Sequence, residues 1–224
     1  MFTEIKSTKM QQQQCELRSF GSEIGGLTRS DGSATFNQGD TTVLVAVYGP
    51  GEVRQNKEII DKATVEVVFK PKTGLPGVYE KSQERLIQNS CAAAILSALH
   101  PRTSILIVVQ VIKDSGSLLS CCINAACLAL MDAGVPMKYL ICSITSALDK
   151  EGTVILDPTD KQCKDAASVM TFAFESRKQN IITTSLSGSC SIEQYNTCLA
   201  ASKLASQKIF AFYRTSVERK LSKS

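Results

Sequence analysis

A short turn of small residues, Ser115-Gly116-Ser117, stands immediately before a long apolar stretch that begins at Leu118. A glycine turn that opens a helix is suited to anion binding, because free N–H groups and the helix dipole both favour negative charge there. A phosphate site would also need a cation, yet Leu119 follows, and the only cation close by in the sequence, Lys113, precedes the turn. No arginine occurs in the range 103–176. We therefore expect this turn to have no guanidinium partner.

Three carboxylates further along the chain could serve a metal ion or move a proton. Asp157, Asp160 and Asp165 lie within one short polar segment. Their proximity in sequence is the only feature that favours such chemistry. The alternative interpretation, above all for Asp165, is a solvated loop carboxylate. Both interpretations stay open at this point.

Four cations surround a loop rich in lysine, glycine and proline, and such side chains bind nucleic-acid phosphates without reading the base sequence. Glutamates alternate with two of them, which halves the local charge, so a solvated charged face is an equally good interpretation. The four candidate RNA-binding residues are Lys70, Lys72, Lys81 and Arg85.

The composition is that of an ordinary globular protein: 224 residues, 43% hydrophobic and 21% charged. The net charge of +4 permits contact with nucleic acid but does not argue for it. The longest apolar run in a strand-like setting, 105–109, is far too short to cross a bilayer, so we expect no membrane partner. Neither a GxGxxG nor a GxxxxGK[ST] motif is present, so no nucleotide cofactor is expected.

The nine cysteines form no CxxC motif and are accompanied by a single histidine, His100, so neither a zinc site nor a disulfide framework is expected. His100 precedes a proline and is interpreted as a helix-end residue. A reducing compartment is favoured. Six cysteines in apolar or small-residue surroundings are expected to be buried free thiols: Cys91, Cys121, Cys122, Cys127, Cys142 and Cys198.

Hydrophobic periodicity and turn signals predict an α+β fold with mixed β-sheets and three long helices. The helices are expected over 80–99, 118–133 and 191–219. We expect residues 1–14 to form a flexible polar tail and 15–224 to form a single domain. Strands are expected in a hairpin over 33–47 that turns at 38–40, and over 63–69, 103–112, 138–148, 153–157, 167–176 and 180–188.

Three segments, in order, resemble the RNase PH family. The segment 15–50, "CELRSFGSEIGGLTRSDGSATFNQGDTTVLVAVYGP", resembles the family's opening, and 116–134, "GSLLSCCINAACLALMDAG", resembles the helix that follows its phosphate-binding turn. The segment 154–174, "VILDPTD…DAASVMTFAF", resembles the part that carries its catalytic aspartates. The match extends from about Cys15 to Arg214. Within the family, the chain most resembles the RNase PH-like subunits of the eukaryotic RNA exosome ring, and the fold expected is an RNase PH-like domain.

The resemblance implies that the charged groups of the family's active site are missing here. Leu119 falls on the arginine that holds phosphate in the family, and Cys163 and Val169 fall on its two catalytic aspartates. A leucine cannot pair with phosphate, and a valine can neither ligate a metal nor move a proton. The region that faces RNA in the family corresponds here to the four cations around the 70–85 loop.

Two functions of different classes follow. The first is a non-catalytic ring subunit that lines the exosome channel, binds RNA non-specifically and needs neither a cofactor nor a metal. Its expected partners are other RNase PH-like ring subunits, RNA-binding cap subunits and single-stranded RNA, in the nucleus, nucleolus and cytoplasm, with the segment 15–26 at an interface. The second is a homodimeric, metal-dependent nuclease or residual phosphorolytic exoribonuclease using Asp157, Asp160 and Asp165.

Overall fold

The computed structural model describes residues 17–222, so the tail expected over 1–14 lies outside the described residues. The first half of the chain forms a five-stranded sheet with the order β1-β2-β3-β5-β4. Its neighbours are antiparallel except for β4 and β5, which are parallel. The strands are β1 (Phe20–Ile24), β2 (Gly32–Gln38), β3 (Thr41–Glu52), β4 (Thr64–Lys70) and β5 (Thr103–Lys113).

The second half forms a four-stranded antiparallel sheet with the order β7-β6-β8-β9. The three long helices and the α+β class predicted from the sequence are confirmed. The strands are β6 (Ile141–Leu148), β7 (Val154–Leu156), β8 (Ser168–Glu175) and β9 (Ile181–Gly188). The helices are α2 (Val78–Ala94), α3 (Leu118–Asp132), α4 (Asp160–Asp165) and α5 (Ile192–Leu221). None of the helices that the structure describes is both long and apolar enough to cross a membrane.

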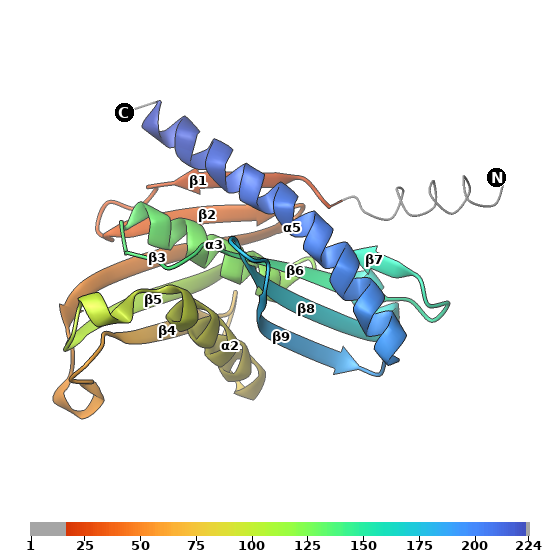
Figure 1. The fold of residues 1–224 in the computed structure, drawn as a ribbon, viewed down its shortest axis with the longest axis horizontal. Helices are drawn as coiled ribbons and strands as arrows, with labels where there is room; N and C mark the ends of the chain where they lie inside the picture. Colours follow the sequence, from red (N-terminus) through yellow and green to blue (C-terminus); the bar gives the residue numbers. More distant parts are fainter. Residues whose placement is uncertain (1–16, 223–224) are drawn as a thin grey trace.

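Helix α3 is the central element of the fold (Figure 1). It contacts β2 and β3 of the first sheet and β6 of the second, and every residue from Ser120 to Leu130 is buried. A helix that is hydrophobic all round is one that is enclosed on all sides. The first sheet approaches it so closely that a Cβ added at Gly32 would lie 2.3 Å from the backbone nitrogen of Ala133, so only glycine fits there.

A buried polar network at Asn124 joins α3 to the second sheet and to α5. The side-chain amide of Asn124 donates to the carbonyl of Ser143 at 3.0 Å and accepts from its N–H at 2.8 Å. The Tyr213 hydroxyl of α5 donates to the same Asn124 oxygen at 2.8 Å. Asn124 and Ser143 are fully buried, and Tyr213 is 1% exposed. A network of this kind fixes one relative placement of the three elements, because each buried polar atom is costly to leave unpaired.

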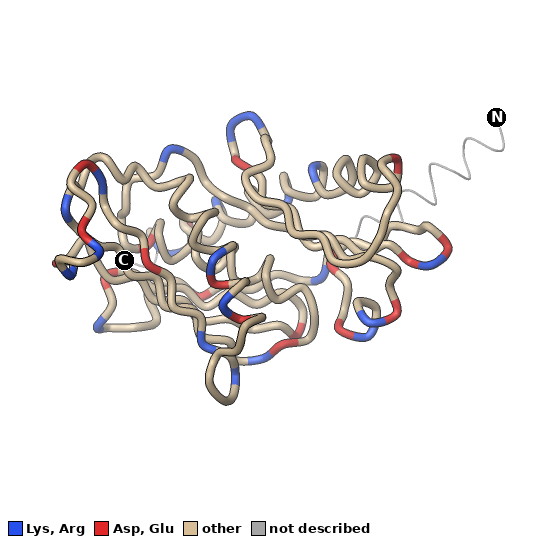
Figure 2. Tube along the Cα trace, turned by 90° about the horizontal axis from the view of Figure 1, so that it is seen from below, with Lys and Arg blue, Asp and Glu red and all other residues tan. Residues whose placement is uncertain are grey.

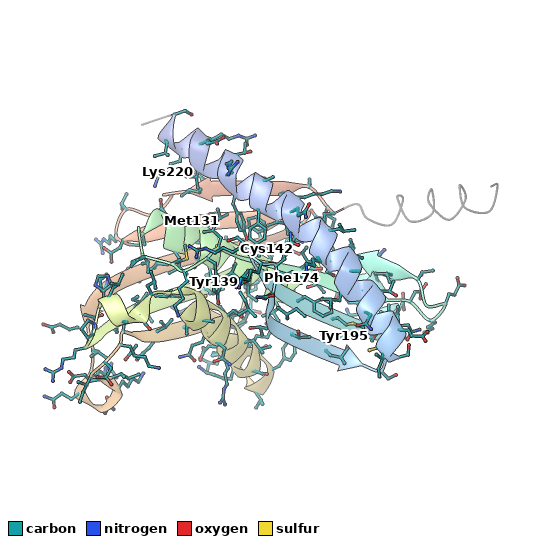
Figure 3. All side chains as sticks on the ribbon, viewed as in Figure 1. Met131, Tyr139, Cys142, Phe174, Tyr195 and Lys220 are labelled. Atoms are coloured by element: carbon teal, nitrogen blue, oxygen red, sulfur yellow. The ribbon has the colours of Figure 1, made fainter. Side chains whose placement is uncertain are left out.

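Helix α5 covers the outer face of the second sheet and reaches β1 of the first (Figure 1). Cys142 and Phe174 lie beneath it, and Tyr195 lies near its start (Figure 3). The ring of Phe172 on β8 packs edge-on against Tyr195, with centroids 5.4 Å apart. At the other end Phe212 packs against Phe20 of β1, with centroids 5.6 Å apart. Because α5 and α3 cover opposite faces of β6, all residues of that strand are buried.

Several element boundaries differ from the sequence-based expectations. The helix expected over 80–99 ends at Ala94, because Ile95 adopts an extended conformation and forms a β-bridge with Met137. A separate 3-10 turn follows, and His100 ends it, as expected of a helix-end residue. Strand β1 and the short helix α4 were not predicted, whereas the six cysteines predicted to be buried are all free and buried.

An ion pair between distant parts of the chain connects the N-terminal segment to the end of β7. Arg18 donates from Nε and Nη2 to the two carboxylate oxygens of Asp157, at 2.7 and 2.6 Å. The Asp157 side chain is fully buried, and that of Arg18 is 19% exposed. Burial lowers the pKa of Arg18, but the hydrogen bond and the charge of Asp157 outweigh burial and raise it, so the guanidinium stays charged.

We predict that Asn124→Ala lowers the free energy of unfolding by about 3 kcal/mol, because it leaves two backbone groups of Ser143 and the Tyr213 hydroxyl without partners. Tyr213→Phe keeps the packing and removes one hydrogen bond, so it should cost only about 1 kcal/mol. Urea unfolding followed by circular dichroism measures both values. If the two variants lower the free energy of unfolding equally, Asn124 is not the residue that joins the three elements.

We predict that Arg18→Met lowers the free energy of unfolding by about 3 kcal/mol, because Asp157 is then left buried without its counter-charge. The double variant Arg18→Met/Asp157→Leu should recover part of that loss, since no isolated charge remains. As the matched control, Lys57→Met breaks the exposed pair with Glu66 and should cost less than about 1 kcal/mol. If Arg18→Met and Lys57→Met unfold at the same urea concentration, the buried pair contributes no more to the free energy of unfolding than the exposed pair does.

Candidate functional site

A cavity of about 300 Å³ lies where α2, the start of α3 and the inner face of the second sheet meet. The inner face is the side of β6, β8 and β9 opposite α5. Alternate residues of these strands point the same way, and the register places Thr145 beside Thr171, and Thr171 beside Ser185. The residues that line the cavity are Tyr79, Ser82, Gln83, Leu86, Asp114, Gly116, Ser117, Leu118, Leu119, Thr145, Asp160, Cys163, Val169, Thr171, Ser185 and Ser187.

The turn before α3 forms one wall of this cavity and is held rigidly. Gly116 has a φ of +103°, and a Cβ there would lie 2.6 Å from the Pro158 carbonyl oxygen, so the position requires glycine. Ser117 caps α3 in the left-handed conformation, and its hydroxyl donates to the same carbonyl at 3.0 Å. The Asp160 N–H donates to the Ser115 carbonyl at 3.1 Å. The loop after β7 therefore fixes the turn in place.

The described charged side chains that line the cavity are acidic, whereas a phosphate site needs a cation. Among residues 17–222, no lysine or arginine lines it, and the two charged side chains that do are Asp114 and Asp160. The Asp114 carboxylate accepts the Gly116 N–H at 3.1 Å, so one donor of the turn is already engaged by an anion. A negatively charged ligand here would meet the carboxylate of Asp114, and that of Asp160, which Lys164 partly compensates, while no described cation lines the cavity itself.

An arginine does lie against the turn, contrary to the expectation from sequence that Lys113 would be the only cation close by. Arg18 donates to the carbonyls of Ser115 and Gly116, at 3.4 and 3.3 Å. Its guanidinium is engaged by Asp157, and Arg18 lines a second groove, which shares Asp114 and Asp160 with the cavity. The two residues are 139 positions apart in sequence, so no spacing rule could reveal the contact. Lys113 itself pairs with Asp40.

The three positions singled out by the family resemblance meet in the cavity. Leu119, Cys163 and Val169 come from α3, α4 and β8, and all three line it. The Cys163 thiol is half-buried, and burial raises its pKa despite the opposing effect of a Ser117 backbone hydrogen bond. A thiol with a raised pKa stays protonated near neutral pH and is a weak nucleophile. The geometry of a site is present, but these three side chains cannot supply charge to it.

The three candidate carboxylates are not gathered into one site. Asp157 is buried and held by Arg18, whereas Asp160 is exposed and pairs with Lys164 at 2.6 Å. Asp165 is exposed at the end of α4. Within the described range 17–222, no group of three or more His, Cys, Asp or Glu residues could hold a metal ion.

The four candidate RNA-binding cations are all exposed, at the end of β4 (Lys70), in the following loop (Lys72) and on α2 (Lys81 and Arg85). Lys81 pairs with Glu84 at 2.9 Å, and in the part of the chain that the structure describes no ion pair engages the other three. Lysine and arginine are scattered over the surface with acidic residues among them (Figure 2). Both interpretations of these cations, RNA contact and solvated face, therefore stay predictions.

The polar residues that α2 and the second sheet contribute to the cavity, such as Gln83 and Thr171, were not singled out from the sequence. Tyr79, Ser82, Gln83 and Leu86 recur at helical spacing on one side of α2, and this side faces the cavity. That spacing is a usable signal, although it does not distinguish a cavity wall from an ordinary packed face. The contributions of β8 and β9 alternate, as strand geometry requires.

Comparison with known proteins agrees with this architecture. The model described as "3' exoribonuclease family, domain 1" matches residues 16–136, and domain 2 of the same family matches 139–204. The boundary between them falls between α3 and β6. An Arabidopsis thaliana protein named "Exosome complex exonuclease RRP46 homolog" is 34% identical, over 93% of this chain and 95% of its own length. The exosome complex component rrp46 of Schizosaccharomyces pombe is 32% identical, over 83% of this chain and 84% of its own.

Solved structures agree as well. A crystal structure of rice (Oryza sativa) Rrp46 superposes with a TM-score of 0.88 at 38% identity, covering 92% of this chain and 97% of its own. An Archaeoglobus fulgidus exosome with RNA bound to its active site has the same fold, with a TM-score of 0.78 at 19% identity, over 89% of each chain. The expectations of an RNase PH-like fold and of a resemblance to exosome ring subunits are thus confirmed. The chain belongs to the 3′ exoribonuclease family and carries both of its RNase PH domains.

Proposed function

We propose that this chain is a non-catalytic subunit of an RNA exosome ring, where it supports 3′-to-5′ RNA processing and degradation by lining the channel. Two relatives that align over most of both chains are named exosome complex components, which supports a role in the ring. The single observation that supports the absence of catalysis is that no described cation lines the cavity, where the three residues that the resemblance assigns to the family's active positions, Leu119, Cys163 and Val169, come together. Phosphorolysis needs a positive charge at the attacking phosphate.

The proposed partners are other RNase PH-like ring subunits, RNA-binding cap subunits and single-stranded RNA, and the proposed locations are the nucleus, the nucleolus and the cytoplasm. The edge strand β1 is one surface through which a neighbour could be held, since an edge strand presents unpaired backbone groups. It belongs to the segment 15–26 that we expect at an interface, of which residues 17–26 are described.

The alternative of a metal-dependent nuclease gains no support from the geometry. Its three carboxylates have different surroundings, and the one that is buried, Asp157, is neutralised by Arg18. Some relatives are named exonucleases, so a residual phosphorolytic activity of this chain should still be tested. The inert-subunit proposal is the better supported of the two.

We predict that the double variant Lys72→Glu/Arg85→Glu, reconstituted with the other ring and cap subunits, assembles normally but binds single-stranded RNA more weakly. If each cation contacts one phosphate, the slope of log Kobs against log salt concentration falls by about 1.4, that is, by two contacts at about 0.7 each. Size-exclusion chromatography measures assembly, and fluorescence anisotropy at several salt concentrations measures the slope.

The matched control for this experiment is Arg177→Glu/Lys178→Glu, which makes the same charge change in the exposed turn between β8 and β9. We expect the control to leave the slope unchanged. If the two double variants behave alike, the cations around the 70–85 segment are a solvated face and not an RNA contact. If Lys72→Glu/Arg85→Glu prevents assembly, these residues belong to a subunit interface.

A further inference from the structure

A groove separate from the cavity lies between α5 and the turn that joins β8 to β9. Its volume is about 830 Å³, which is within the range of preformed binding sites. Figure 3 shows one of its residues, Met131, at the end of α3 beside the C-terminal half of α5. We call it the α5 groove, and its lining includes Met131, Leu140, Ser176, Gln179 and one face of α5 between Gln207 and Glu218.

The floor of the α5 groove is apolar. Met131, Leu140 and Phe210 pack against the main hydrophobic core and remain partly exposed. Val217 is also partly exposed and follows Phe210 by seven residues, so both side chains lie on the same side of α5. The apolar surface therefore runs along the helix for about 10 Å. Such a surface suits a helical segment of another protein, whose apolar side chains recur every three or four residues.

The part of the lining that does not belong to α5 is held rigidly by hydrogen bonds. Ser176 donates its N–H to the Leu140 carbonyl at 3.0 Å, and the Leu140 N–H donates to the Ser176 hydroxyl at 3.2 Å. The Glu175 carboxylate accepts from the Lys178 N–H at 3.2 Å and from the Asn180 amide at 3.0 Å, which closes the turn. Because the turn is preorganised, little conformational freedom is lost there when a partner binds.

Three cations surround the apolar floor. Arg214 lines the groove from α5, and Arg177 and Lys178 are exposed in the turn, between two residues of the lining. Within the range 17–222, no ion pair engages any of the three. Glu218 is the one acidic side chain among the described residues of the lining. A segment that carries carboxylates on both flanks of an apolar centre would therefore be complementary to the groove in charge.

We propose that the α5 groove docks an acidic, amphipathic segment of a partner protein. The apolar side chains of the segment lie on Phe210 and Val217. Its carboxylates face Arg214 on one flank and the turn of Arg177 and Lys178 on the other. Nucleic acid fits this groove less well, because phosphates would contact the cations and leave the apolar floor uncovered. The inference concerns a surface separate from the cavity and does not depend on the proposed function.

Fluorescence anisotropy on the full chain tests the proposal with labelled model peptides of about 16 residues, long enough to form a helix. The probe peptide has leucine at every third or fourth position and glutamate at the flanking positions. One control peptide has lysine in place of each glutamate, and the other has serine in place of each leucine. We expect the probe to bind with a micromolar Kd and both control peptides to bind about tenfold more weakly or not at all.

Variants of the three cations test the charge contribution without disturbing the core, because all three side chains are exposed. Arg214→Glu and the double variant Arg177→Glu/Lys178→Glu should each weaken the probe peptide about tenfold and leave the melting temperature unchanged. The matched control is Arg54→Glu/Lys62→Glu, which makes the same charge change at exposed positions between β3 and β4. It should leave the affinity unchanged.

Glu218→Lys is the reciprocal variant, because it removes an acidic side chain from the lining, and it should tighten the probe peptide about threefold. The proposal is overturned if the probe fails to bind at millimolar concentration, binds no better than either control peptide, or binds the cation variants equally well. It is also overturned if a single-stranded RNA binds the groove more tightly than the probe. Self-association of the chain that is lost in Arg214→Glu would show instead that a second copy occupies the groove.

Discussion

The burial of α3 between the two sheets is the constraint on which the rest of the structure depends. A helix enclosed on every side must be apolar or internally paired throughout, which explains both its composition and the network at Asn124. Its N-terminal turn consequently sits at the seam between the two halves of the chain, fixed by Gly116 and by the loop after β7. The cavity exists because α2, α3 and the second sheet converge at that seam.

The backbone at this site is fixed by close contacts, whereas no described lysine or arginine lines the cavity. The backbone arrangement of the family is retained because the packing of α3 requires it, whereas the side chains that would hold phosphate and metal are independent of that packing. Among the described residues, the guanidinium near the turn is that of Arg18, and it is engaged by Asp157 and by the carbonyls of Ser115 and Gly116. On the proposed function, the backbone of the site stays preorganised although no described cation lines it to hold a phosphate.

Local patterns in the sequence were sufficient to predict the long helices and most strands, because apolar residues recur with a period of 3.6 in a half-buried helix and of 2 in a half-buried strand. The family resemblance singled out Leu119, Cys163 and Val169, and the structure places all three at one cavity. They missed the contacts that depend on chain closure: the ion pair of Arg18 with Asp157, and the bridge of Ile95 with Met137 that follows the end of α2 at Ala94. Each of these joins residues whose distance in sequence carries no information about their distance in space.

The most direct test of the account is phosphorolysis by the purified, folded chain. The assay combines a 3′-extended single-stranded RNA, inorganic phosphate and magnesium, and it measures the release of nucleoside diphosphate. The account predicts no release above the level of a chain carrying Asp114→Ala and Asp160→Ala, the two charged side chains that line the cavity among the described residues. Diphosphate release that follows the folded protein through purification and disappears in that double variant would contradict the claim that the site has lost its chemistry.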